Sequence, residues 1–173
     1  MVISMAIFFD TETTGIENAR LVELSYKKDD CPIVTIRCKP PHKIECSASA
    51  VNGIGNWEVK DLLLFKDMPE YKDIKDIFED PDQEFVAHNI EFDIGVLEAE
   101  GIHVVGTVHD TKEMARKKWP KAEKHNLQYL RFWLDIRIEG IAHTSAGDVM
   151  VLEEVWNKLH DNGGDLAGEI DRE

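Results

Sequence analysis

The chain has 173 residues, of which 43% are hydrophobic, and this composition suits one globular domain with a sizeable core. With 34 acidic and 20 basic residues, the formal net charge is -14, unlike the basic balance of most nucleic-acid-binding proteins. The seven Phe and four Trp argue against a disordered chain.

The cysteines predict neither a set of disulfide bonds nor a zinc site. Cys31, Cys38 and Cys46 are odd in number and form no C-x-x-C pair, so we expect a reducing, cytoplasmic location. The apolar stretch 1–9 has no basic residues and is too short for a signal peptide or a membrane span. It indicates a buried strand, and we expect no association with a membrane.

Five strands are predicted in chain order. The nearly continuous apolar run 3–9 indicates a central strand that is buried on both faces. Residues 20–27 and 32–38 indicate a hairpin, because the turn-forming sequence KKDDCP lies between them. Residues 84–89 and 104–109 are the fourth and fifth strands.

Helices are predicted between and after these strands. Residues 47–65 indicate two helical pieces that are broken near Gly53 and Gly55. Further helices are expected at residues 69–78, 90–100, 111–119, 126–133 and 144–160. We expect residues 1–160 to form one domain and residues 161–173 to form an acidic, flexible tail.

This order of elements predicts an α/β fold with a five-stranded mixed sheet. The first three strands would form an antiparallel meander, and helical crossovers would add the last two strands in parallel. Helices should then cover both faces of the sheet. Sites in such sheets gather where strands end and helices begin.

Two acids follow the first apolar run, in the sequence FFDTETTGI. Side chains in an extended chain alternate, so Asp10 and Glu12 can face the same site. The alternative is turn chemistry at the end of a strand, with Gly15 supplying an unusual backbone angle.

Two later helix starts carry further candidates. Asp93 flanks the apolar stripe of helix 90–100 and needs a partner there, either an arginine or a metal. Asp148 lies in the first turn of helix 144–160, where the alternative is a capping box with Ser145. His143 precedes that helix, and a lone histidine in a loop is usually a surface residue.

Together these positions predict a metal centre. Asp10, Glu12, Asp93 and Asp148 lie at three element boundaries, and four clustered carboxylates would repel one another unless cations or protons neutralised them. Hard divalent cations such as Mg²⁺ prefer oxygen ligands. We therefore interpret the set as a two-metal site.

Three stretches carry a resemblance to a known family: FDTETTG, VAHNIEFDIGVL and AHTSAGD. They resemble, in order and spacing, the three motifs of the DEDDh superfamily of 3'-5' exonucleases. The H-x₄-D spacing from His143 to Asp148 is that of its histidine branch. The chain looks closest to the DNA proofreading branch and to the short exonuclease X group. The resemblance implies a ribonuclease H-like, three-layer α/β/α fold.

The resemblance also implies catalytic roles. Asp10, Glu12, Asp93 and Asp148 would hold two divalent ions, Mg²⁺ or Mn²⁺, with Asp10 bridging them. His143 would act as the general base toward the attacking water. The products would be nucleoside 5'-monophosphates.

A pocket for the 3'-terminal nucleotide is implied as well. Its residues would be Thr13, Gly15, Ile16, His88, Asn89 and Phe92, with Ile16 as a wedge between the last bases. For the last three, the alternative is packing beneath the fourth strand. Asn52 departs from the family, in which a histidine thought to touch the substrate is frequent.

The implied partners are DNA 3' ends, as single strands or frayed ends. The alternative is an RNA-trimming or short-oligonucleotide 3'-5' exoribonuclease, because the 2'-hydroxyl is recognised by details of the pocket. A DNA polymerase or a repair protein is a possible partner, and the oligomeric state is left open. A non-catalytic binding module is disfavoured, since all four acids and the histidine are present.

One basic segment stands out in this acidic chain. Residues 112–124 hold six basic side chains against two acidic ones, which can mark a nucleic-acid footprint. A solvated, lysine-rich helix face explains the pattern equally well.

Overall fold

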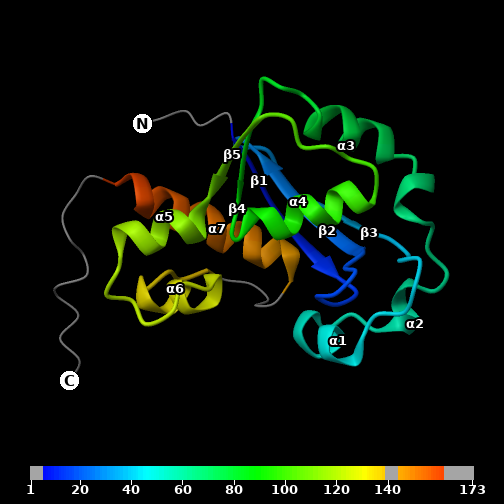
Figure 1. Cartoon of the computed structure of the whole chain (residues 1–173), viewed down its shortest axis with the longest axis horizontal. Helices are drawn as coiled ribbons and strands as arrows, with labels where there is room; N and C mark the ends of the chain where they lie inside the picture. Colours follow the sequence, from blue (N-terminus) through cyan, green and yellow to red (C-terminus); the bar gives the residue numbers. More distant parts are fainter. Residues whose placement is uncertain (1–5, 139–143, 162–173) are drawn as a thin grey trace.

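The computed structural model describes residues 6–138 and 144–161. In this part of the chain, a five-stranded mixed sheet lies between two layers of helices (Figure 1). The predicted α/β fold with the three-layer, ribonuclease H-like arrangement is confirmed. The start of the first predicted strand, residues 3–5, and most of the predicted tail lie outside the described residues.

The sheet has the strand order β3-β2-β1-β4-β5. β1 pairs antiparallel with β2 and parallel with β4, and β4 pairs parallel with β5. The strands span Ala6–Thr13 (β1), Leu21–Lys28 (β2), Val34–Arg37 (β3), Glu84–Ala87 (β4) and Thr107–Asp110 (β5). The expected meander with two parallel additions is therefore present.

Helices occupy the predicted positions with small differences in length. They span Cys46–Asn52 (α1), Asn56–Val59 (α2), Tyr71–Phe78 (α3), Ile90–Ala99 (α4), Thr111–Lys118 (α5), Leu127–Trp133 (α6) and Ser145–His160 (α7), with a 3₁₀ turn at Phe65–Asp67 (η1). None of these described helices has the length and apolar character needed to cross a membrane.

Two expected boundaries are wrong for identifiable reasons. The helical prediction for residues 47–65 fails after Val59, because the chain there runs beside Lys39, whose backbone N–H donates to Leu63 O at 2.8 Å. The fifth strand begins at Thr107 rather than at residue 104. Gly106 passes so close to the preceding strand that a Cβ there would lie 2.1 Å from the Gln83 carbonyl oxygen.

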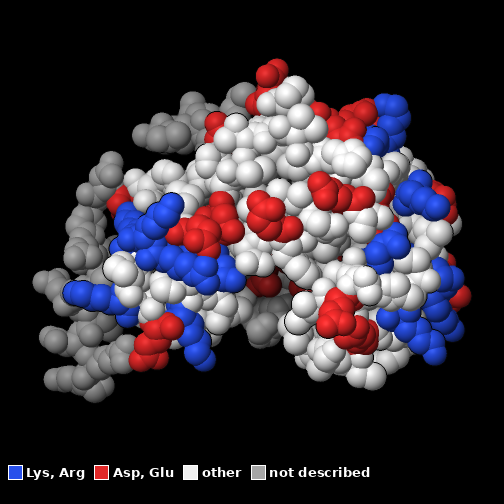
Figure 2. All heavy atoms as spheres, in the orientation of Figure 1, with Lys and Arg blue, Asp and Glu red and all other residues white. Residues whose placement is uncertain are grey.

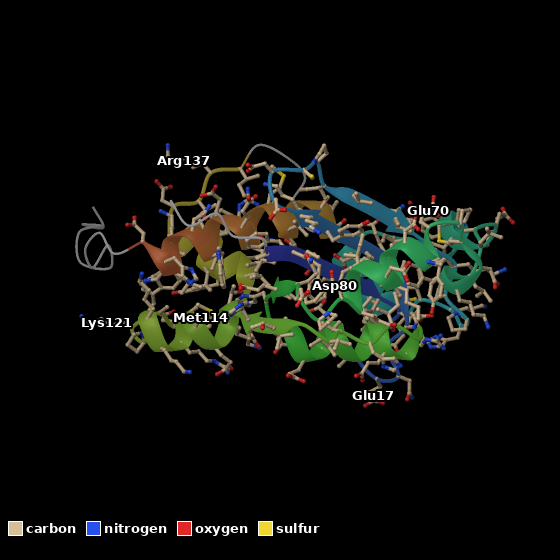
Figure 3. All side chains as sticks on the ribbon, turned by 90° about the horizontal axis from the view of Figure 1, so that it is seen from above. Glu17, Glu70, Asp80, Met114, Lys121 and Arg137 are labelled. Atoms are coloured by element: carbon tan, nitrogen blue, oxygen red, sulfur yellow. The ribbon has the colours of Figure 1, made fainter. Side chains whose placement is uncertain are left out.

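Successive side chains of β1 point to opposite faces of the sheet, so the strand contributes to two separate hydrophobic cores. Ile7 and Phe9 face the core formed with α3 and α4, whereas Ala6 and Phe8 face the core formed with α5, α6 and α7. Figure 3, viewed from above, shows α4 and α7 on opposite sides of β1. β1 is thus buried on both faces, as its apolar run predicts.

Phe78 should contribute strongly to the free energy of unfolding. Its ring is fully buried, stacks on Phe85 at 5.2 Å and makes an edge contact with Phe9 at 5.3 Å. We expect Phe78→Ala to lower the free energy of unfolding by about 3–5 kcal/mol, measured by chemical denaturation. Val105→Ala, at a side chain that is 56% exposed, is the control and should change it little. Similar losses for both variants would contradict this packing.

Candidate functional site

The site begins with two carboxylates on one face of β1. Asp10 and Glu12 are two residues apart and point the same way, as alternation predicts. The strand continues to Thr13, so both acids lie inside it and not beyond its end as we expected. A register shift follows between Glu12 and Thr13, where the chain leaves regular pairing.

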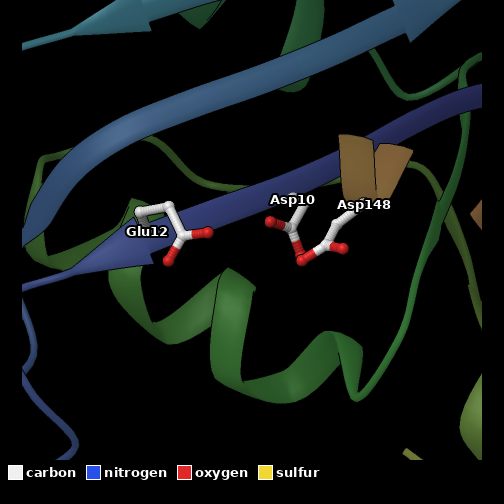
Figure 4. Close-up of side chains that lie close together, drawn as sticks. All are labelled: Asp10, Glu12 and Asp148. Carbon is white, nitrogen blue, oxygen red and sulfur yellow. The ribbon is translucent and has the colours of Figure 1, made fainter. Parts of the chain in front are cut away.

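The first turn of α7 brings Asp148 to these acids. One carboxylate oxygen from each of Asp10, Glu12 and Asp148 lies within 4.8 Å of the others (Figure 4). The Nε2 amide of Gln128, on α6, donates a hydrogen bond to Asp148 Oδ1.

The capping-box alternative for Asp148 is wrong. Thr144 is the N-cap of α7, and its Oγ1 accepts a hydrogen bond from the Gly147 backbone N–H at 3.1 Å. The Ser145 hydroxyl instead donates to Glu23 Oε1. Because Thr144 caps the helix, Asp148 is available to face the β1 acids.

Asp93 lies beside this group and has a different partner from those expected. It is in the first turn of α4, and its Oδ1 accepts hydrogen bonds from the Thr11 backbone N–H at 3.1 Å and from Thr11 Oγ1 at 2.6 Å. A threonine between the two β1 acids thus takes the role that we assigned to an arginine, and the role of Asp93 as a metal ligand stays a prediction. The carboxylates that meet within 4.8 Å in the described residues are three, without Asp93.

The acids raise one another's pKa. Burial, followed by the charges of Asp93 and Asp148, raises the pKa of Asp10 well above its usual range. Burial, followed by Asp148 and Glu23, raises the pKa of Glu12 to about 8. Burial also raises the pKa of Asp93 to about 7, against the opposing effect of the two Thr11 hydrogen bonds. Near neutral pH the group therefore holds protons that a cation would replace.

These residues fit a divalent metal ion. The site offers only carboxylate oxygens, which are the ligands that Mg²⁺ and Mn²⁺ prefer. Burial and repulsion between the acids raise the pKa values of Asp10 and Glu12, and a bound cation would relieve that repulsion.

Two polar neighbours of the site were missed in the sequence. Glu23 is 4% exposed and lies directly opposite Glu12 on β2. Its signal was an acid inside the apolar run LVELS of a predicted strand, where alternation places it on the same face as Ser25. Gln128 gave no comparable signal, since a glutamine near the start of a helix is ordinary.

The loop after β1 holds the predicted substrate residues Thr13, Gly15 and Ile16. Thr13 Oγ1 donates to Gly15 O at 2.9 Å, which tightens the turn. The φ of Gly15 is not positive, so our argument from an unusual backbone angle is wrong. A side chain there would instead collide with the carboxylate of Glu45, at 2.6 Å from its Cδ. Ile16 is 85% exposed, as a wedge would need to be.

Asn52 supports this loop from within. It is buried in α1, its Nδ2 donates to Thr13 O at 3.3 Å, and its Oδ1 accepts from the Ile54 backbone N–H at 2.9 Å. Its side chain therefore connects α1 to the loop after β1.

His88 is bound within the protein at both ring nitrogens. Nε2 donates to His125 O at 2.7 Å, and Nδ1 lies 2.9 Å from the Thr111 hydroxyl, which can donate to it. Burial lowers the pKa of His88 to about 4, so the ring is neutral at physiological pH. His88 therefore joins the end of β4 to the segment before α6.

The other two residues of the predicted pocket differ in exposure. Phe92 packs partly buried against the core beneath α4, which agrees with the packing alternative. Asn89 is exposed, has a φ of 73° and accepts a hydrogen bond from Lys112 Nζ at 3.0 Å through its Oδ1. The predicted general base, His143, lies outside the described residues.

Comparisons with known proteins place the chain among nucleases. A family model described as 3'-5' exonuclease matches residues 3–139, a span that includes Asp10, Glu12 and Asp93 and ends before His143 and Asp148. A search of curated proteins found no match.

Solved structures share the fold. A structure of exonuclease X in complex with 5' overhanging duplex DNA has a TM-score of 0.69 and 23% identity, covering 89% of this chain and 92% of that chain. A structure of Brucella melitensis NrnC with bound Mg²⁺ has a TM-score of 0.59 and 18% identity, covering 90% and 72%. A third, described as the apo form of a nuclease, has a TM-score of 0.62 and 22% identity, covering 91% and 72%.

The metal-free protein should lose stability as pH rises. Glu12 keeps its proton in the folded state up to a pKa of about 8, whereas the ordinary value is 4.5, so the folded state binds more protons between these values. The contribution of Glu12 to the free energy of unfolding is then fully present below the ordinary pKa and is lost as pH rises through about 8. Thermal unfolding in chelator-treated buffer across this range measures the effect.

Glu12→Gln is the matched variant for this measurement, since it removes the titrating group at nearly constant size. Its unfolding should depend less on pH than that of the wild type. Identical pH profiles for the two proteins would contradict the assignment.

Proposed function

We propose, because this chain belongs to the 3'-5' exonuclease family, that it hydrolyses the phosphodiester bond at the 3' end of DNA, on single strands or frayed ends. The observation that carries this proposal is the convergence of Asp10, Glu12 and Asp148 within 4.8 Å on one face of the sheet. The products would be nucleoside 5'-monophosphates.

Each residue of the site has a proposed role in this reaction. Asp10, Glu12, Asp93 and Asp148 would together hold two divalent ions, Mg²⁺ or Mn²⁺. Metal ions bound there supply an activated water and stabilise the leaving 3'-oxygen. His143, in its neutral form, would accept the proton of the attacking water. The loop from Thr13 to Ile16 would seat the 3'-terminal nucleotide.

The basic segment supports a nucleic-acid substrate. Figure 2 shows a blue patch over α5, next to a hollow that has acidic side chains at its floor. Lys112, at the start of α5, is bound to Asn89 of the predicted pocket, and Lys117 and Lys121, further along the basic segment, are exposed. Lys118 instead donates to backbone carbonyls at the end of α7, including Leu159 O at 2.9 Å. We propose that the basic segment 112–124 contacts the phosphate backbone upstream of the 3' end.

DNA is the proposed substrate because DTETTG resembles the proofreading branch and because a structural relative was solved with duplex DNA. A polymerase or repair protein remains the proposed kind of partner.

The exposed Cys31 and Cys46 are free thiols, which supports the proposed cytoplasmic location.

The proposed function is tested with matched oligonucleotides. Purified protein is incubated with DNA and RNA strands of one sequence, labelled at the 5' end, with Mg²⁺, with Mn²⁺ or with a chelator. Stepwise shortening of DNA that requires metal is expected, with slower shortening of RNA. Faster loss of RNA would favour the exoribonuclease alternative, and intact strands in every lane would overturn the nuclease activity.

Substitutions at the site separate chemistry from folding. Asp148→Asn should abolish turnover while keeping or raising the melting temperature, because it relieves repulsion from Asp10. His143→Ala should lower kcat by about 10²–10⁴-fold, the usual range for a general base. Near-wild-type turnover of Asp148→Asn, or a loss below about tenfold for His143→Ala, would remove that residue from the proposal.

The basic segment 112–124 predicts that activity depends on salt concentration. The double variant Lys117→Ala/Lys121→Ala should weaken the dependence of log(kcat/KM) on log[salt] by roughly 1.4, from about 0.7 for each lost phosphate contact on a single strand. The control is Lys66→Ala/Lys72→Ala, which removes two exposed lysines near α3. Equal slopes for the two double variants would mean that the basic segment does not contact the substrate.

A further inference from the structure

Glu23 is a buried acid in a place that is electrostatically unfavourable. It is paired directly with Glu12 across β1 and β2, and its charge is one of the causes that raise the pKa of Glu12 and of Asp10. An acid retained beside a group of acids needs compensating partners. Those partners show what Glu23 does.

The sheet carries two polar rows across three strands on the face toward α7. One row is Asp10 on β1, Ser25 on β2 and Thr35 on β3. The next row is Glu12, Glu23 and Arg37 on the same strands. Because paired residues share a face of a sheet, all six side chains point toward the helix that carries Asp148.

Both oxygens of Glu23 are occupied. Oε2 accepts a hydrogen bond from Arg37 Nε at 2.7 Å, and Oε1 accepts one from the Ser145 hydroxyl at 2.7 Å. Ser145 is fully buried, and its hydroxyl also lies 2.7 Å from that of Ser25. The first turn of α7 is thus tied to β2 by two hydrogen bonds with side chains.

The network continues away from the site. Arg37 Nη1 also donates to Glu58 Oε1 at 3.1 Å, and Glu58 Oε2 accepts from the Gly55 backbone N–H at 2.7 Å. Arg37 therefore holds Glu23 from the side opposite Ser145 and connects it to the start of α2.

We propose that Glu23 is a positioning residue for the metal centre: through Ser145, it holds the first turn of α7 so that Asp148 stays beside Asp10 and Glu12. This inference rests on the proposed function for the identity of the centre. Ser145 and Asp148 are three residues apart on one helix, so fixing one places the other. Repulsion between Asp148 and the two β1 acids pushes this turn away from the sheet, and the Glu23–Ser145 bond opposes that displacement.

A carboxylate is the group that these partners require. Arg37 and Ser145 both donate, and a carboxylate offers an acceptor to each. A glutamine would lose the charge that binds Arg37, and its NH₂ group would face Ser145, whose hydroxyl would have to change from donor to acceptor. Glu23→Gln is therefore expected to weaken the two links at nearly constant volume.

The test uses two variants that break the link at different atoms. Glu23→Gln removes the charge and one acceptor, whereas Ser145→Ala removes the hydroxyl and leaves the charge and the Thr144 cap intact. The control is Glu100→Gln, since the Glu100 carboxylate is bound by Arg20 Nε at 2.8 Å, its side chain is only 8% exposed, and it belongs to none of these rows.

Three quantities are measured on the full chain, below the melting temperature of every variant. They are the affinity for Mn²⁺ by calorimetry, hydrogen exchange of the backbone amides 146–149 without metal, and kcat and KM. Glu23→Gln and Ser145→Ala should bind Mn²⁺ about 10–100-fold more weakly and lower kcat more than they raise KM. Both should also exchange faster at the start of α7, whereas Glu100→Gln should match the wild type in affinity and exchange there.

The outcomes separate the possible explanations. Wild-type Mn²⁺ affinity and exchange in Ser145→Ala would overturn the inference, and a loss confined to Glu23→Gln would assign the effect to charge alone. If the wild type binds no Mn²⁺, the proposed metal centre fails. The exchange rates then still decide whether Glu23 holds α7, and unchanged rates in both variants would overturn that too.

Discussion

The crowding of like charges at the end of β1 is the constraint on which the rest of this structure depends. Asp10, Glu12 and Asp148 meet within 4.8 Å, and Asp93 lies beside them. Burial, followed by repulsion from neighbouring acids, raises the pKa values of Asp10 and Glu12, and burial raises the pKa of Asp93. Such a site favours a bound cation over protons, which is the chemical basis of its proposed function.

The fold holds these acids together at a cost in stability that other parts of the structure offset. β1 lies between two apolar cores, so its register is fixed on both faces. Thr11 binds Asp93 with two hydrogen bonds, Thr144 caps α7, and Glu23 binds Ser145. Each contact secures one of the elements that carry a carboxylate. Weakening any of them should therefore affect metal affinity before it affects the fold.

The sequence allowed much of this to be predicted, because hydrophobic periodicity determined the strand order and alternation placed Asp10 and Glu12 on one face. It misplaced the end of β1, since the apolar run stops at Phe9 while the strand continues through polar residues that are satisfied by distant partners. Thr11 and Asp93 are 82 positions apart, and Glu23 and Ser145 are 122 apart. Contacts at such separation leave no local pattern.

The most direct test of the central claim is a calorimetric titration of Mn²⁺ into the metal-free protein near neutral pH, in two buffers of different ionisation enthalpy. The account predicts saturable binding with release of protons, because cations displace the protons that the raised pKa values retain. Asp10→Asn should bind at least about tenfold more weakly, in keeping with the loss of a ligand. Binding without proton release, or equal affinity in the two proteins, would contradict the account.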